Sequence, residues 1–372
     1  GVTVVASKKQ LLTIKELPYV KEVKDFHEHK PKRKIESPRP ENAVLAANSS
    51  TDYGFSEGQV KQLGLDNLHD AGYTGKGVII AVIDCGFKLS HKAFNHPEYP
   101  LKVIAQWDFV ENDNDVIPRP EVHTDYYDHG TGVLGVVASY APGELLGSGY
   151  DAGYILCNAE DGTEEYYLEE RWYVAALEFA ESQGADVLTS SLVLYDGYSP
   201  KDTDGNTSIM TKGMNIAVGN GVICMAGAGN DGNDQDPDVT HLMIPGDAEN
   251  VIAVGAVQSN SRIASFSSDG PTIDGRLKPE VLAMGSRVWT ISLLDNNGYI
   301  RASGTSVATP LLAGAVACIM QAHPEWTVQK LREALFHSGD YYIRNGKPDP
   351  LYIHGYGIPN VYEAAGKPVK KE

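Results

Sequence analysis

The pattern of apolar and polar positions changes near residue 53. From there on, short continuous apolar runs alternate with longer segments that have helical spacing. A strand that is apolar at every position is typical of a parallel sheet covered on both faces, and the helices between the strands supply that cover. We therefore predict an α/β fold, a three-layer α/β/α sandwich with a mostly parallel central sheet. The predicted strands are residues 78–83, 153–157, 185–188, 222–225 and 251–254, and the predicted helices are residues 168–183, 208–219, 306–322 and 328–336.

The first fifty residues have a different pattern. They begin with short β-branched and alternating stretches around one small helix, predicted over residues 9–16, and residues 27–51 are polar, rich in proline and without periodicity. We predict two parts: residues 1–48, a small segment with its linker, and residues 49–372, the main domain. Residues 1–40 contain ten Lys and Arg against five Asp and Glu. This basic segment either docks on the acidic main domain or is a solvated arm.

The overall composition excludes several classes of protein. The 372 residues carry 31 Lys and Arg against 49 Asp and Glu, a net charge of −18, and so acidic a surface disfavours nucleic acid as the main partner. No run of 18 apolar residues occurs, so we expect no membrane-spanning helix and no membrane partner. The four cysteines, Cys85, Cys157, Cys224 and Cys318, lie outside any CxxC or Cys/His cluster. We expect free buried thiols and no structural zinc.

Two polar side chains stand where a predicted element begins or ends. Asp84 follows a buried apolar run and precedes Gly86, and ligands of parallel sheets gather at the carboxyl ends of the strands. His129 precedes a glycine-rich apolar segment that we expect to be helical, residues 130–138, whose small residues let the backbone pack closely around an imidazole. Taken singly, each residue has a simpler interpretation. Asp84 would be a loop or capping aspartate, and His129 would be a capping histidine.

Ser306 stands at the start of a predicted helix, and Asn230 stands after the end of a predicted strand. Ser306 opens a long apolar helix, with Gly304 before it and Pro310 in the first turn. The amino terminus of a helix supplies free N–H groups and a positive dipole end, which suits a nucleophile that must stabilise an oxyanion, although a serine N-cap is the simpler interpretation. Asn230 follows a buried strand, where its amide could donate to such an oxyanion. The order Asp, His, Asn, Ser, each in a matching context, is improbable by chance.

These four segments resemble the motifs of the subtilisin-like serine proteases, the subtilases, whose triad has the chain order Asp, His, Ser. The similarity extends over residues 73–365, most of the chain, and the set of motifs is highly specific. Residues 266–278 (FSSDGPTIDGRLK) are most similar to secreted subtilases of Bacteroidetes-type bacteria. The motifs that carry the resemblance are residues 75–86 around Asp84, 128–131 around His129 and 304–310 around Ser306.

The resemblance implies a serine endopeptidase, a hydrolase that cuts peptide bonds. Asp84 would orient and stabilise His129, which would take the proton of Ser306 and later protonate the leaving amine. Ser306 would form the acyl-enzyme. Asn230 and the N–H group of Ser306 would form the oxyanion hole.

The family binds its peptide substrate as an added β-strand between two segments of the enzyme. The family usually has glycine at the position of Val193, and several members have glycine at the position of Met243, on the floor of the S1 pocket. The added bulk predicts a shallow pocket for small to medium apolar P1 residues, and loop shifts that restore the depth are the alternative. The residues that match the substrate-binding segments are Ser191, Leu192 and Val193 on one side and Gly227, Ala228 and Gly229 on the other.

Cofactors, partners and location are further implications of the resemblance. No cofactor is required, and we assign no metal ligands. Many subtilases bind calcium through an aspartate where this chain has Ala93, so calcium remains possible only at acidic loops such as residues 111–115 and 231–238, and solvated turns are the alternative. Residues 17–23 resemble the last strand of subtilase propeptides. We therefore expect protein or peptide substrates, an inhibitory contact with the chain's own propeptide segment, and a secreted or cell-surface zymogen, with a cytoplasmic location as the alternative.

Three other functions remain open at this point. The chain could be an inactive subtilase scaffold that binds peptides without cutting them. It could also be a regulated intracellular protease, or a maturation protease with few substrates. Reaction with a serine-directed fluorophosphonate separates the first of these from any active protease.

Overall fold

The computed structural model describes residues 7–21, 23, 51–117, 127–161, 169–193, 197–292 and 294–368. Its centre is a seven-stranded sheet in the order β2-β5-β1-β6-β7-β8-β9, and every neighbouring pair is parallel. The sheet strands are β1 (Ile79–Asp84), β2 (Lys102–Asp108), β5 (Gly153–Asn158), β6 (Val187–Ser190), β7 (Ile223–Gly227), β8 (Ile252–Val257) and β9 (Val281–Met284). Two small antiparallel pairs lie outside it: β3 (Tyr140–Ala141) with β4 (Leu145–Leu146), and β10 (Val288–Ile291) with β11 (Tyr299–Ala302).

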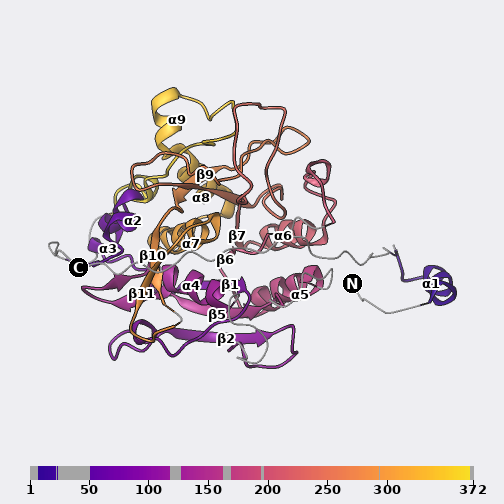
Figure 1. Ribbon diagram of the computed structural model, residues 1–372, viewed down its shortest axis with the longest axis horizontal. Coiled ribbons are helices and arrows are strands. Elements are labelled where there is room, and N and C mark those ends of the chain that lie inside the picture. Colours follow the sequence, from indigo (N-terminus) through magenta and orange to yellow (C-terminus); the bar gives the residue numbers. More distant parts are fainter. Residues whose placement is uncertain are drawn as a thin grey trace.

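Helices cover both faces of this sheet, as Figure 1 shows. The side chains of β1 alternate between two apolar cores: Ile80 and Val82 belong to the larger core, and Ala81 and Ile83 to the smaller one. The larger core also contains residues of α4 (Tyr127–Ala138), α7 (Thr305–Ala322) and α8 (Val328–His337), and the smaller one contains residues of α5 (Glu169–Ser182) and α6 (Ile209–Gly219). The predicted three-layer α/β/α architecture is confirmed. The other helices described between residues 51 and 368 are α2 (Glu57–Gln62), α3 (Leu65–Asp70), η1 (Lys92–Phe94), η2 (Pro200–Asp202), α9 (Asp340–Asn345) and α10 (Val361–Ala364).

The prediction missed the two edge strands of the sheet. β2 has a mixed pattern, with Lys102 exposed and only Asp108 fully buried, so it lacks the continuous apolar run of a central strand. β9 is only four residues long, and its apolar run is too short to separate from a loop by periodicity. The five predicted strands and four predicted helices are all present, with each end either as predicted or displaced by at most three residues.

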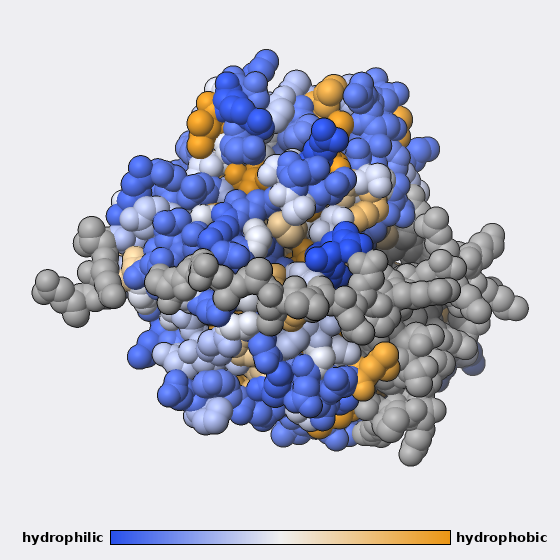
Figure 2. All heavy atoms as spheres, turned by 60° about the vertical axis from the view of Figure 1, so that its left-hand side comes forward, coloured by the Kyte–Doolittle hydropathy of each residue, from blue (hydrophilic) through white to orange (hydrophobic). Residues whose placement is uncertain are grey.

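Helix α7 runs through the centre of the larger core. It is the one helix of the described residues that is long and apolar enough to cross a membrane, yet 78% of that window is buried inside the protein. The core helix of a globular domain has the same composition, so α7 is weak evidence for a membrane span. Figure 2 shows a face of the molecule that is largely hydrophilic, with scattered apolar side chains. All four cysteines are free and buried, as predicted.

The amino-terminal segment contains the predicted small helix, α1 (Lys8–Lys15). Ser7 caps it: its hydroxyl accepts a hydrogen bond from the N–H group of Gln10, whose side chain in turn accepts one from the N–H group of Ser7. The positions described between Leu17 and Val23 form turns and irregular chain but no strand. A strand needs a partner to bond its backbone groups, and no strand pairs with this segment within the described chain.

Candidate active site

The side chains singled out in the sequence gather at one edge of the sheet, where its parallel strands end. Asp84 is the last residue of β1, Ser191 directly follows β6, and Asn230 lies three residues beyond β7. Because these strands are neighbours in the sheet, their carboxyl ends bring the three residues into one region.

Asp84 and His129 form a hydrogen-bonded pair. The side chain of Asp84 is fully buried, and its Oδ1 lies 2.8 Å from Nδ1 of His129 and also accepts the N–H group of Cys85 at 2.9 Å. His129 lies within the first turn of α4, not before the helix as predicted. Gly130 makes the approach possible, because a Cβ atom there would lie 2.4 Å from the carbonyl oxygen of Gly86 and 2.9 Å from Oδ1 of Asp84.

This pairing changes the proton affinity of the imidazole. Burial lowers the pKa of His129, but the charge of Asp84 and the hydrogen bond to it outweigh that effect, and with the charge of Glu160 they raise the pKa to about 9. The side chain of His129 is still 37% exposed, so a substrate or solvent molecule can reach it. The imidazole therefore becomes a neutral base only as the pH rises toward this value.

Ser306 and Asn230 are held together at the start of α7. The helix begins at Thr305, one residue before the predicted start. Oδ1 of Asn230 accepts the N–H group of Thr305 at 2.8 Å, which leaves the Nδ2 donor of Asn230 on the side of Ser306. A Cβ atom at Gly304 would lie 2.7 Å from Oγ of Ser306 and 3.7 Å from Nδ2 of Asn230, which shows that both groups face the same glycine.

The carbonyl group of Ser306 is also fixed. Oγ of Ser191 donates a hydrogen bond to it at 2.7 Å. Helix α4 packs against α7, but no hydrogen bond joins His129 to Ser306 among the described residues. Such bonds are often long in the absence of substrate and tighten when it binds.

The predicted substrate-binding residues lie on two chain segments that continue neighbouring strands. Ser191, Leu192 and Val193 follow β6, whereas Gly227 ends β7 and leads into Ala228 and Gly229. Met243 contacts the second of these segments: its N–H group donates a hydrogen bond to the carbonyl of Ala228 at 2.9 Å. A Cβ atom at Gly229 would lie 2.4 Å from Cγ of Met243, so the methionine side chain packs directly on this glycine.

Sequence reasoning missed three contributions to this region. Ser191 supports Ser306, Glu160 raises the pKa of His129, and Ser268 accepts the N–H group of Asp231 at 3.0 Å. Glu160 stands just beyond β5, the neighbour of β1, so its position after a strand was an available signal. The other two contacts join segments far apart in the chain, and no local pattern indicates them.

The acidic loops have a structural use for their carboxylates. Asp113 accepts the N–H group of Asp115, and Asp234 accepts that of Asp236, as in ordinary aspartate turns. Ala93, at the predicted position of a lost calcium ligand, is fully buried. In the described chain, one group of side chains has its potential metal-ligand atoms within 4.8 Å of one another, Asp84, Cys85 and His129. Calcium binding by the loops therefore stays a prediction.

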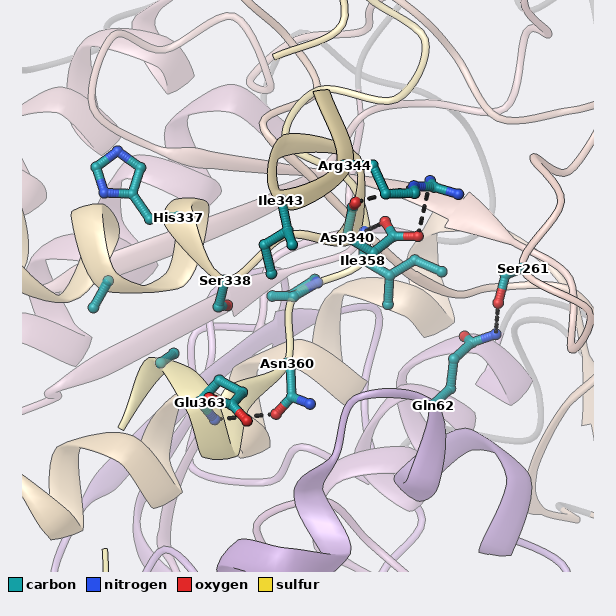
Figure 3. A pocket seen from close by; sticks show the side chains of 13 residues that line it. Gln62, Ser261, His337, Ser338, Asp340, Ile343, Arg344, Ile358, Asn360 and Glu363 are labelled. Atoms are coloured by element: carbon teal, nitrogen blue, oxygen red, sulfur yellow. Dashed lines mark hydrogen bonds and ion pairs between the residues drawn. The ribbon is translucent and has the colours of Figure 1, made fainter. Parts of the chain in front are cut away.

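A hollow with a volume of about 770 Å³ lies elsewhere. Figure 3 shows that several of its polar side chains are paired with neighbours, Arg344 with Asp340 and Gln62 with Ser261. None of the residues singled out in the sequence lines it. The serine and histidine that line it are used elsewhere: Oγ of Ser338 donates to the carbonyl of Leu335 at 2.7 Å, and the ring of His337 stacks on Tyr342.

Comparison with known proteins identifies the family and the fold of this chain. The model of the subtilase family matches residues 75–357. Subtilisin E of Bacillus subtilis is 32% identical over 317 residues, which cover 85% of this chain and 71% of subtilisin E. A subtilisin of Bacillus pumilus is 31% identical over 85% of this chain and 99% of its own. A solved protease of Pseudoalteromonas arctica has the same fold, with a TM-score of 0.65 and 22% identity over 86% of this chain and 99% of its own. The chain belongs to the subtilase family and is a subtilisin-like serine endopeptidase.

Proposed function

We propose that Asp84, His129 and Ser306 form the catalytic triad of this endopeptidase. Neutral His129 accepts the proton of Ser306 through Nε2 while Oγ attacks the substrate carbonyl, and Asp84 stabilises the imidazolium that results. His129 then gives the proton to the leaving amine, and a water molecule repeats the sequence to release the acyl group. The Nδ2 donor of Asn230 and the N–H group of Ser306 bond the oxyanion.

The observation that carries this proposal is the Asp84–His129 contact of 2.8 Å, next to a helix start where Asn230 is already oriented by Thr305. A capping aspartate or histidine alone would not need this buried pair. Residue 130 must be glycine for the pair to form, because a Cβ atom there would clash with Gly86 and Asp84. The local sequence is therefore matched to the Asp84–His129 contact.

A serine-directed fluorophosphonate tests the proposal directly. The parent protein should be labelled on Ser306 and should hydrolyse casein, and Ser306→Ala should abolish both. Ser303→Ala is a matched control, because Ser303 is an exposed serine three residues away that accepts a hydrogen bond from Arg287. A parent protein that binds peptides but is not labelled would support the inactive-scaffold alternative instead.

We further propose that the enzyme prefers small to medium apolar P1 residues. The support is the packing of Met243 on Gly229, together with the bulk of Val193 at the end of the facing segment. Met243→Ala should raise the cleavage rate at a P1 phenylalanine relative to a P1 alanine. Met320→Ala, a half-buried methionine at the end of α7, should leave this ratio unchanged. A parent enzyme that cleaves fastest after large aromatic residues would contradict the proposal.

The origin and location of the enzyme are proposals of the same kind. We propose that residues 1–48 are a propeptide segment with its linker and that the enzyme acts outside the cell as a processed zymogen; the Bacteroidetes-type origin stays a prediction. The support is the basic charge of this segment against the acidic remainder of the chain. Amino-terminal sequencing of the active enzyme should find a start near residue 49.

Activity that survives EDTA would show that calcium is not required.

A further inference from the structure

A polar segment of the chain, residues 231–242, connects two parts of the proposed active site. Asn230, the proposed oxyanion donor, immediately precedes it, and Met243, on the floor of the proposed S1 pocket, follows it. The segment contains no helix or strand, so it has no regular hydrogen-bond ladder to fix its shape. Isolated backbone bonds and side-chain contacts hold it in place, among them the N–H group of Gly232 to the carbonyl of Phe266 at 2.9 Å.

One buried carboxylate supplies contacts near both ends of the segment, and Nδ2 of Asn233 adds bonds to the carbonyls of Ala264 and Ser267. Asp269 is 1% exposed, and its Oδ2 accepts the N–H group of Asp234 at 2.9 Å. Its Oδ1 lies 2.7 Å from Nδ1 of His241, and its carbonyl oxygen accepts the N–H group of His241 at 3.2 Å. Asp269 thus holds the segment near both ends, four residues after Asn230 and two residues before Met243.

Ser268, the residue before Asp269, holds the chain around Asn230 in the same way. The N–H group of Ser268 donates to the carbonyl of Gly229 at 3.0 Å, and its Oγ accepts the N–H group of Asp231 at 3.0 Å. The pair Ser268–Asp269 therefore bonds the chain on both sides of Asn230 and again at His241. Movement of this segment would displace the oxyanion donor and the S1 floor together.

We infer that Asp269 and His241 are positioning residues, which hold segment 231–242 so that Asn230 and Met243 keep the spacing that transition-state binding and P1 selection require. Neither residue needs to touch the substrate. The inference rests on the proposed function for its kinetic consequence, but the physical contact it assigns is independent of that function.

Substitutions of His241 separate the hydrogen bond from simple bulk. His241→Asn keeps a donor near the position of Nδ1, whereas His241→Leu keeps the volume and removes the donor. We expect His241→Leu to lower kcat/KM by about 10- to 100-fold, the range expected for a displacement approaching 1 Å in an active site. The loss should fall mainly on kcat and should change the ratio of rates between P1 alanine and P1 phenylalanine. His241→Asn should recover most of the rate and the ratio.

The chain offers a matched control in the pair Asp349–His354. Its carboxylate is 3% exposed and lies 2.8 Å from Nδ1 of the histidine, so burial and geometry nearly equal those of Asp269–His241. This pair lies in a neighbouring loop, whose Tyr352 carbonyl accepts the N–H group of Gly270, but among the described residues no hydrogen bond joins residues 349–354 to segment 231–242. His354→Leu should lower the melting temperature as His241→Leu does, but leave kcat and P1 selectivity at parent values.

Amide hydrogen exchange of residues 231–243 supplies a second measurement that needs no catalysis. Exchange in this segment should increase in His241→Leu and return toward the parent rate in His241→Asn. Parent-like exchange in His241→Leu, or equal kinetic losses in His241→Leu and His354→Leu, would overturn the inference. A parent protein that fluorophosphonate does not label would instead overturn the proposed function, and the exchange result would still decide whether His241 holds the segment.

Discussion

Gly130→Ala is the sharpest test of the Asp84–His129 geometry, because it adds one methyl group beside the pair. The new Cβ would lie 2.4 Å from the carbonyl oxygen of Gly86, about 0.6 Å inside the 3.0 Å below which real Cβ contacts are essentially never found. It would also lie 2.9 Å from Oδ1 of Asp84, which is fully buried and cannot turn away into solvent. Either the first turn of α4 or the end of β1 must therefore move.

The expected cost follows from the size of that movement. A displacement of this order in an active site can lower the rate about 100-fold, so we expect kcat to fall by about that factor. KM should change little, since the predicted peptide-binding segments follow β6 and β7, whereas the atoms nearest the new Cβ belong to Gly86 and Asp84. The assay is steady-state hydrolysis of a peptide p-nitroanilide, normalised by active-site titration.

Gly132→Ala, on the same helix, is the matched control. Its Cβ would lie 3.7 Å from Cγ2 of Thr290, an ordinary contact. Alanine in the interior of a helix is more stable than glycine by about 0.5–1 kcal/mol, so this variant should keep parent activity and melt at a higher temperature. Parent activity in Gly130→Ala, or equal losses in both variants, would refute the reasoning.

Three further predictions concern charge and hydrogen bonding. Because Asp84 raises the pKa of His129 to about 9, kcat/KM should rise through neutral pH and level off above pH 9, and Glu160→Gln should move this limb to lower pH; a parent limb at pH 6.5 would contradict it. The raised pKa also means that the stability the pair contributes is complete below pH 6.5 and is lost as the pH rises through 9. Asn230→Ala should lower kcat by about 10²–10³-fold, the loss known for the corresponding asparagine of subtilisin itself, and an unchanged kcat would remove this residue from the oxyanion hole. Lys278→Met should reduce the free energy of unfolding by about 3–5 kcal/mol, because Lys278 is 1% exposed and pairs with buried Glu280 at 2.8 Å; urea unfolding measures this, and a change within error would show that the pair is dispensable.

The sequence by itself determined the layered architecture and the positions of the reactive side chains. A strand that is apolar at every position buries all its side chains only where both faces of the sheet are covered. The pattern of apolar positions therefore predicts the five central strands without further information. Asp84, Asn230 and Ser306 stand at the ends of such elements, and the chain order of the motifs identified the family. The edge strand β2 was missed because exposure on one side leaves a mixed pattern there.

Only the tertiary structure decided which of these groups meet. The 2.8 Å contact of Asp84 with His129, the support of Ser306 by Ser191, and the hold of Asp269 on His241 each join residues at least 28 positions apart in the chain. Periodicity and capping report what a residue needs within a few positions of itself. Contacts between distant segments depend instead on how strands are ordered in the sheet and how helices pack on it, and local patterns carry no record of that order.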